Sequence, residues 1–223
     1  MTKRENILKR YTTLAGAIDL LVEGRVSLLD PSSWKDTNDT QFLRAYCNEV
    51  DKKSLYAACF TQEPETYHHW QVFAGTNEGV CIELDRAALL SSLTDPNYFW
   101  GDVEYLTLDG IAKLDNVDAF RLPFMKRKGY IDEGEFRLLY QSDEEQKAVH
   151  CFDIERSWIK RIVLNPWMPD SLAKSVKKAL GSIPDCKPIR IVRTTLIDNA
   201  QWKSACNRVD QFTTLQGSPP RQI

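Results

Sequence analysis

The sequence predicts an α+β fold with mixed, mainly antiparallel sheets and interspersed helices. Segments with strand-like patterns outnumber helical ones, and the two kinds follow one another irregularly instead of forming a strand–helix repeat. No linker-like, repetitive or low-complexity stretch divides the first 212 residues. We therefore expect one globular domain over residues 1–212, followed by a flexible, polar C-terminal tail over residues 213–223.

The first half of the chain mixes predicted strands and helices. Residues 15–24 are amphipathic, with Ala17, Leu20 and Leu21 on one face and Gly24 as a stop signal, so we expect a helix there. A nearly continuous apolar run over residues 54–62 indicates a central strand buried on both faces. The other patterns predict strands over residues 6–14, 25–30 and 78–85, a polar loop over 31–39, and helices over 40–50, 65–77 and 86–93.

The second half is similar. Residues 116–130 read as a helix that is interrupted near Pro123, and residues 170–183 as a helix that stops near Gly181. Strands are predicted over residues 101–109, 129–140, 158–166 and 187–197.

Composition narrows the function classes. The net charge of −2 gives no global basic field, so a nucleic-acid partner would have to be held by a local patch. The six cysteines form no CxxC pair and no zinc-ligand spacing, which predicts free thiols and no metal site. The N-terminus lacks the apolar core of a signal peptide, and no apolar run approaches transmembrane length. We expect a cytoplasmic protein without a membrane partner.

Charged residues alternate in the predicted strand "GYIDEGEFRLLY" over residues 129–140. Because strand side chains alternate between faces, Glu133, Glu135 and Arg137 are expected to share one face, with Phe136 and Leu138 on the other. A solvent-facing side with Glu–Arg pairing to its neighbours explains this pattern. A functional site built on the same carboxylates also explains it.

The order of several short motifs resembles a bacterial family. These motifs are "LKRY", "EGRVSLLDPSSWKDTND", "ACFTQ", "HHW", "GVCIELD", "VEY", "FMKRKGY", "EGEFRLL" and "IKRIVLNPWM". They resemble, in order from about residue 7 to about residue 195, the bacterial domain-of-unknown-function family 2971. The family name declares no function.

A more distant likeness is to ADP-ribosyltransferases, and it implies a fold of that type with NAD as the substrate. In those enzymes a His or Arg at the end of the first strand helps to hold NAD, a middle strand carries Ser-Thr-Ser or a Tyr, and a late strand carries Gln-x-Glu or Glu-x-Glu. The matching positions are Arg10, Thr61, Glu133 and Glu135. Two departures stand out: the middle element is Cys-Phe-Thr, and the first strand has no His.

The resemblance implies a role for each candidate residue. Glu135 would stabilise an oxocarbenium-like ribose cation, and Glu133 would orient or deprotonate the acceptor. Arg10 would hold a phosphate, and the remaining candidates for NAD binding are Tyr11, Thr61 and Arg137. We expect the strands of Arg10, Cys59 and Glu135 to form the wall of one cleft.

Two further residues are candidate contacts to a substrate or a nucleic acid. Lys126 belongs to the basic cluster "KRK", which could equally be a solvated face. Asp36 could contact a ligand, or it could simply cap the following helix.

Three functions compete at this point. The first is an NAD-consuming transferase that modifies a protein or nucleic acid, of the kind found in toxin and phage-defence systems. The second is a non-catalytic ligand-binding or interaction subunit of such a system, with a partner protein from it. The third is a metal-dependent nuclease using Asp36, Asp39, Lys126 and the two glutamates, although "EGE" lacks the Lys expected two residues on.

Overall fold

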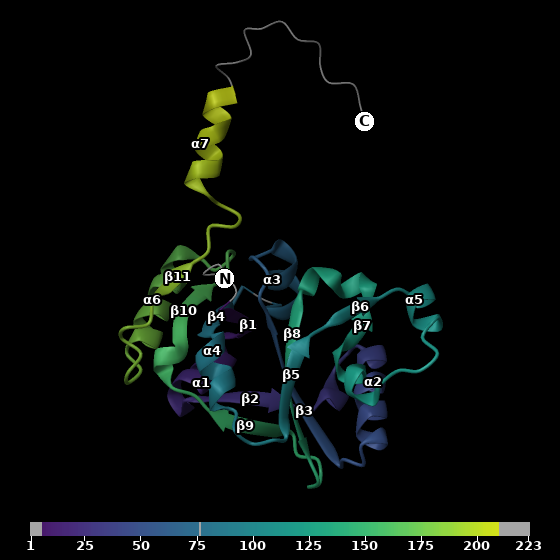
Figure 1. Cartoon of the computed structure of the whole chain (residues 1–223). Helices are drawn as coiled ribbons and strands as arrows, with labels where there is room; N and C mark the ends of the chain where they lie inside the picture. Colours follow the sequence, from purple (N-terminus) through teal and green to yellow (C-terminus); the bar gives the residue numbers. More distant parts are fainter. Residues whose placement is uncertain (1–5, 76, 210–223) are drawn as a thin grey trace, which may run out of the picture.

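The structure is a computed structural model that describes residues 6–75 and 77–209, with side chains up to residue 205. A large sheet forms the centre of the described part (Figure 1). Its strands are β1 (Ile7–Thr13), β2 (Arg25–Leu29), β3 (Ser54–Thr61), β4 (Gly79–Asp85), β5 (Tyr98–Asp102), β8 (Glu135–Ser142), β9 (Val149–Asp153), β10 (Ile159–Leu164) and β11 (Ile191–Arg193). A small separate sheet pairs β6 (Glu104–Leu106) with β7 (Met125–Arg127).

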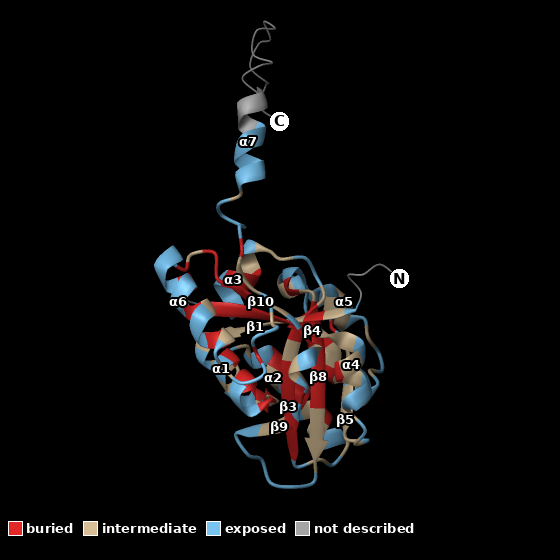
Figure 2. Cartoon of the chain, turned by 90° about the vertical axis from the view of Figure 1, so that its left-hand side faces the viewer, coloured by how far each residue is buried: buried red, intermediate tan, exposed pale blue. Residues whose placement is uncertain are grey.

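The described part of the chain also contains α-helices and short 3-10 helices. The α-helices are α1 (Leu14–Glu23), α2 (Thr37–Glu49), α3 (Tyr67–Phe73), α4 (Arg86–Ser92), α5 (Leu108–Ala112), α6 (Asp170–Gly181) and α7 (Ala200–Val209). Short 3-10 helices are η1 (Pro31–Ser33), η2 (Ala119–Phe124), η3 (Lys128–Glu133) and η4 (Arg156–Trp158). Helix α7 stands away from the rest of the body in both views (Figures 1 and 2).

The pairing of the strands confirms the predicted fold class. Within the large sheet every pair is antiparallel except β10 with β11, and β6 with β7 is also parallel. Strand β3 is the junction, because it pairs with β8 along its whole length and with β1 and β2 at single positions. This junction brings β1 and β8 to the two sides of β3.

The two faces of the sheet differ in what covers them. The main core lies on one face, where α1, α4 and α6 pack on apolar strand residues such as Leu8, Ile82 and Phe136. On the other face, α2 covers β3 and β8, and α3 covers β1 and β4. Figure 2 shows the resulting band of buried strands at the centre of the molecule. The polar face between α2 and α3 holds the candidate site.

The strand predicted over residues 129–140 is wrong in its first half. Residues 128–133 form η3, and Gly134 follows with a φ of 50°, in the left-handed region that favours glycine. Strand β8 begins only at Glu135. Glu133 is therefore the last residue of η3, and the expected shared strand face holds only for Glu135 and Arg137.

Other boundaries differ as well. The strand expected over residues 101–109 is split into β5 and β6, with Val103 between them. Instead of a helix over residues 116–130, the chain forms η2, β7 and the start of η3. Pro123 lacks an N–H and restricts the residue before it, which disfavours a continuous α-helix. Strand β9 and helices α5 and α7 have no counterpart among the predicted elements.

The described residues test only part of the predictions about cysteines, the C-terminal tail and membrane-spanning segments. The five cysteines with described side chains are free thiols, whereas the side chain of Cys206 and the tail over residues 213–223 lie outside the described part. Among the described residues, no helix is long and apolar enough to cross a membrane.

Candidate active site

A row of polar residues crosses five strands on the face between α2 and α3. Lys9 of β1 pairs with Thr61 of β3, and Thr61 pairs with Glu135 of β8. In the other direction, Lys9 pairs with Glu83 of β4, which pairs with Arg161 of β10. Directly paired residues point to the same side of a sheet, so all five side chains share one face. The register thus places the candidates Thr61 and Glu135 next to each other.

Arg137 organises a buried ion network beside this row. It is 0% exposed, and it donates from Nε to Glu135 Oε1 at 2.8 Å and from Nη2 to Glu135 Oε2 at 3.0 Å. Its two Nη atoms also donate to the two oxygens of Asp39 on α2, each at 2.9 Å. The carbonyl of Pro123 accepts a further bond at 2.7 Å, and the Trp34 ring lies 5.3 Å from the guanidinium carbon. Bidentate pairs of this kind fix both partners in position.

Lys126 joins the second glutamate to the network. Its Nζ donates to Glu133 Oε2 at 2.5 Å and to Glu135 Oε2 at 3.1 Å, and it lies 3.8 Å from Asp39 Oδ2. Lys126 comes from β7 and Glu133 from η3, so the two glutamates meet through Lys126 and not through a shared strand face.

Three carboxylates therefore share two cations, and their pKa values diverge. Burial alone would raise the pKa of Glu135, but Arg137 and Lys126 outweigh it and lower that pKa to about 2. Burial raises the pKa of Glu133, and Lys126 offsets this only in part. Burial likewise raises the pKa of Asp39 against the opposing effect of Arg137. Glu135 therefore keeps its charge to a lower pH than an ordinary glutamate, whereas Glu133 becomes protonated at a higher pH than one.

Two neighbouring cavities open on this face. A small one of about 60 Å³ is lined by Lys9, Tyr11, Cys59, Phe60, Thr61, Phe73, Glu133 and Glu135. A larger one of about 590 Å³ shares Lys9 and Tyr11 with it, and Glu83, Arg161, Arg190 and Arg193 line its other walls. The two cavities are therefore adjacent, with Lys9 and Tyr11 as shared lining residues, and Glu135 lines only the smaller one.

Arg10 does not join this cleft. It lies between Lys9 and Tyr11 on β1, so its side chain points to the opposite face of the sheet. There Nη2 donates to the carbonyl of Ser27 at 2.8 Å, and the guanidinium lies 5.8 Å from the Phe60 ring. The expected convergence of Arg10 with Glu135 is therefore wrong, although their strands do lie close together. Lys9 and Tyr11 occupy the place expected for Arg10.

Lys126 and Asp36, the two candidate contacts to a substrate or a nucleic acid, have different surroundings in the structure. Lys126 is buried in the ion network and is not part of a solvated face. Asp36 caps α2, because its carboxylate accepts from the backbone N–H groups of Asn38 and Asp39. The capping interpretation of Asp36 is thus confirmed, and its ligand contact stays a prediction.

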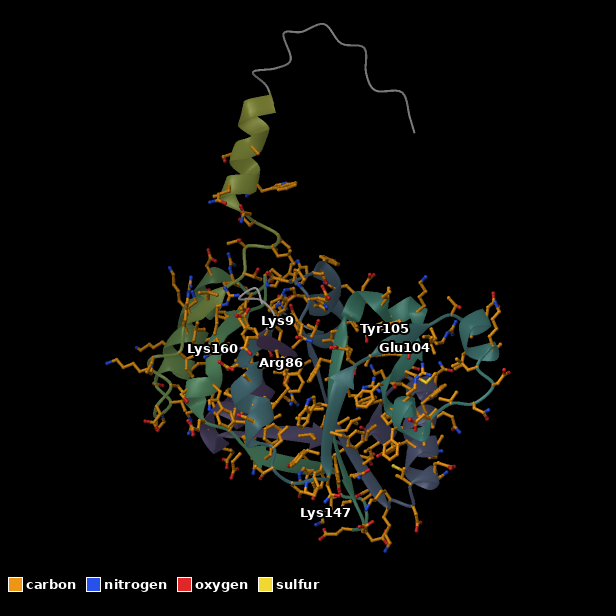
Figure 3. The ribbon with its side chains drawn as sticks, viewed as in Figure 1. Lys9, Arg86, Glu104, Tyr105, Lys147 and Lys160 are labelled. Atoms are coloured by element: carbon orange, nitrogen blue, oxygen red, sulfur yellow. The ribbon has the colours of Figure 1, made fainter. Side chains whose placement is uncertain are left out.

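Sequence reasoning missed the roles of three residues at the site, of which Asp39 was named only among the carboxylates of the nuclease alternative. Asp39 meets Arg137 across 98 positions of sequence, and nothing in the local pattern indicates that contact. Tyr105 accepts a hydrogen bond from the backbone N–H of Glu135 at 2.8 Å. Figure 3 labels Lys9 and Tyr105, which lie on the left and right of β8 in that view. The third, His69, is fully buried on α3, where Nε2 lies 3.1 Å from the carbonyl of Glu133 and the ring stacks on Tyr11.

Comparisons with known proteins give only loose likenesses. No protein-family model matches the chain, so membership of family 2971 stays a prediction. A search of curated proteins also finds no match. Among solved structures, Thermus sp. 2.9 DarT in complex with NAD+, with carba-NAD+ and with ADP-ribosylated ssDNA is similar, at TM-scores of 0.44, 0.43 and 0.44 and identities of 13%, 13% and 12%. These matches cover 85% of this chain and 95%, 95% and 94% of the DarT chains. Likenesses of this level establish neither a shared site nor a shared activity.

Proposed function

We propose that the protein consumes NAD and transfers ADP-ribose to a macromolecule, with Glu135 as the central catalytic residue. The observation that carries this proposal is the buried carboxylate of Glu135, which its neighbours keep ionised, in the wall of a cavity whose neighbour is lined by four cations and two carboxylates. A carboxylate with its charge fixed in a low-dielectric site stabilises positive charge that develops in a transition state.

The larger cavity suits the nucleotide part of NAD. Its volume of about 590 Å³ lies in the range of cofactor sites. Lys9, Arg161, Arg190 and Arg193 line it together with the carboxylates Glu65 and Glu83, and Arg161 pairs with Glu83. Guanidinium groups recognise phosphates through paired N–H donors. Because Lys9 and Tyr11 also line the small cavity, a dinucleotide lying along this face would bring a ribose toward Glu135.

The chemistry follows from the two glutamates. The bond between the ribose C1′ and the nicotinamide nitrogen breaks, and nicotinamide leaves with the electron pair. Ionised Glu135 stabilises the resulting oxocarbenium-like cation. The acceptor nucleophile then bonds to C1′ and gives its proton to Glu133, whose raised pKa suits that role. Asp39 and Arg137 position Glu135, and Lys126 sets the separation of the two glutamates.

One observation favours a non-catalytic ligand-binding role as the second candidate. Both carboxylate oxygens of Glu135 already accept bonds from Arg137 or Lys126, as they would in a purely structural network. On this interpretation the same cavities bind a nucleotide and no bond is broken.

The nuclease alternative has less support. Its carboxylates Asp39, Glu133 and Glu135 do lie together, but each is engaged by Lys126 or Arg137. In the described part of the chain, no group of three or more His, Cys, Asp or Glu side chains is placed to hold a metal ion.

The acceptor and the biological setting belong to this proposal as well. A protein or a nucleic acid is the acceptor class, and a toxin or phage-defence system with its partner protein is the setting. Single-stranded DNA is a sensible first acceptor to try, since one of the DarT structures holds ADP-ribosylated ssDNA.

The test uses NAD labelled on the adenylate. The full chain is incubated with this NAD and with single-stranded DNA or a cell extract, and free nicotinamide and labelled macromolecule are measured. We expect nicotinamide release, transfer of label, and a rise in melting temperature with NAD. A rise in melting temperature without turnover supports the binding role. If NAD is not turned over and does not shift the melting temperature, NAD is neither the substrate nor the ligand.

A further inference from the structure

His69 lies behind the small cavity beside Glu135 and does not line it. It is fully buried on α3, which packs against β1 and η3 (Figure 1). Three residues that do line the cavity nevertheless contact the His69 ring: Tyr11, Phe73 and Glu133. His69 thus connects parts of the cavity wall that come from β1, α3 and η3.

The hydrogen bond of His69 determines which ring nitrogen carries the proton. Nε2 lies 3.1 Å from the carbonyl oxygen of Glu133, and a carbonyl can only accept, so Nε2 is the donor. Nδ1 is buried and has no hydrogen-bond partner in the described part of the chain. A second N–H at Nδ1 would be a buried donor without an acceptor, which is costly. Burial also lowers the pKa of His69, so the neutral ring with its proton on Nε2 is favoured.

The carbonyl of Glu133 lies at the end of η3, just before the chain enters β8. Gly134 follows in a left-handed conformation, and pairing with β3 begins only at Glu135. The position of Glu133 is therefore not set by the sheet. It is held from two other elements, because Lys126 of β7 binds its carboxylate and His69 of α3 binds its carbonyl.

The same ring also supports the aromatic residues of the cavity. Its centroid lies 5.1 Å from that of Tyr11, with 27° between the planes, and 6.3 Å from that of Phe73, with 30°. Trp70 meets Tyr11 edge-on from the same helix at 5.0 Å, so the wall has other apolar support. The bond to Glu133 instead needs one N–H at one point, which makes it the contact that a substitution can isolate.

We propose that His69 is a positioning residue, which holds Glu133 by its backbone and thereby favours transfer of ADP-ribose to the acceptor over hydrolysis. The inference rests on the proposed function, in which Glu133 takes the acceptor's proton. Without the bond the end of η3 is held less firmly, and the carboxylate of Glu133 no longer keeps one position relative to the acceptor. Water is less dependent on an oriented base, so hydrolysis of NAD is affected less.

Two amide substitutions separate the hydrogen bond from the ring. His69→Gln places an N–H near the position of Nε2, whereas the shorter His69→Asn places it near the position of Nδ1, out of reach of Glu133. Both variants lose the ring, so the difference between them reports the hydrogen bond. We expect the ratio of label transfer to NAD hydrolysis to stay within about twofold of wild type in His69→Gln. In His69→Asn it should fall about five- to tenfold, the effect of one lost hydrogen bond.

His150→Asn is the matched control. His150 is a partly buried histidine of β9 that stacks on Tyr140 and shares a hydrogen bond of 2.7 Å with Tyr98. It lines neither of the two cavities beside Lys9. Its substitution also removes a stacked, hydrogen-bonded ring, yet it should leave the ratio of transfer to hydrolysis unchanged. Thermal melts of each variant set the temperature at which the assays use folded protein.

NMR provides a readout that does not depend on turnover. In the full chain with ¹⁵N-labelled histidine, we expect the ring-nitrogen shifts of His69 at pH 7 to show a neutral ring protonated at Nε2. The backbone amide of Gly134 follows the carbonyl that His69 holds. We expect this amide to exchange with solvent faster in His69→Asn than in His69→Gln.

A His69 ring protonated only at Nδ1 would overturn the inference, because nothing would then donate to Glu133. Equal ratios of transfer to hydrolysis in His69→Asn and His69→Gln would also overturn it, as would an equal fall in His150→Asn. Absence of nicotinamide release in wild type would instead remove the proposed function. The ring-nitrogen shifts and the amide exchange decide separately whether His69 holds Glu133.

Discussion

Glu135 and Arg137 lie two residues apart on β8, and their side chains meet in the buried space beneath α2. An exposed strand would gain little from such a pair, because water screens it. Here the exposed fractions are 5% and 0%, so each charge depends on its partner. Loss of either charge would leave the other buried without that partner, which destabilises a folded protein.

Removal of Arg137 should therefore be costly. Arg137→Met removes one of the two cations that Glu135 and Asp39 share and leaves their buried carboxylates beside Lys126. We expect a loss of about 3–5 kcal/mol in the free energy of unfolding. Chemical denaturation measures this loss. Arg121→Met, which breaks an exposed pair with Glu104, is the control and should cost less than about 1 kcal/mol. Similar losses in both variants would contradict the buried network.

The low pKa of Glu135 predicts a dependence of stability on pH. Its pKa is about 2 in the folded protein against an ordinary value of 4.5, so its contribution is present above about pH 4.5 and is lost as the pH falls toward 2. Between about pH 5 and about pH 3 this amounts to roughly 2 kcal/mol. The raised pKa values of Asp39 and Glu133 act in the opposite direction, so a variant must isolate the effect of Glu135.

The comparison that isolates it is wild type against Glu135→Gln. Denaturation at both pH values should show that wild type loses about 2 kcal/mol more than the variant on acidification. Equal losses would show that Glu135 is not held ionised by its neighbours.

Glu133 is predicted to act on the acceptor. Glu133→Gln removes the group that takes the acceptor's proton but leaves Glu135 and its two cations in place. We expect transfer of label to fall by about two orders of magnitude, with a smaller fall in NAD hydrolysis, because water is less dependent on an oriented base. Parallel assays of label transfer and nicotinamide release measure the two rates. Equal losses in label transfer and in nicotinamide release would show that Glu133 only supports the ion network around Arg137 and Lys126, and does not act on the acceptor.

At the level of elements, the turn before β8 explains why pattern analysis misplaced Glu133. The alternation Glu133–Glu135–Arg137 reads as one strand, yet Gly134 adopts a left-handed conformation that ends η3 and starts β8. A glycine inside an apparent strand is a known sign of such a break. Even so, the side chain of Glu133 reaches the site, because Lys126 of β7 lies between the two glutamates.

The N-terminus of α2 supports a prediction about Asp36. Asp36→Ala removes the cap and should lower the free energy of unfolding by about 1 kcal/mol, whereas Asp36→Asn keeps a good capping residue and should be nearly neutral. Nicotinamide release should be unchanged in both variants. A loss of activity in Asp36→Asn without a loss of stability would instead support a ligand contact.

For the whole molecule, the sequence predicted the class and the main elements because periodicity and stop signals are local. Helix α1 ends as expected at Gly24, and β3 is buried along most of its length. Contacts between elements that are far apart in the sequence could not be predicted from local patterns, and the contact of Asp39 with Arg137 is the clearest case. The face of β1 was ambiguous for the same reason, since only the register with β3 shows that Lys9 and Tyr11 face the cleft and that Arg10 does not.

The central claim is that the ionised carboxylate of Glu135 drives cleavage of NAD. The most direct test is the rate of nicotinamide release by the full chain, measured for wild type and Glu135→Gln below the melting temperature of the variant. Glu145→Gln, which changes an exposed carboxylate, is the matched control. We predict a fall of about two orders of magnitude or more for Glu135→Gln, unchanged turnover for Glu145→Gln, and retained NAD binding in both. Wild-type turnover in a folded, NAD-binding Glu135→Gln protein would contradict the account.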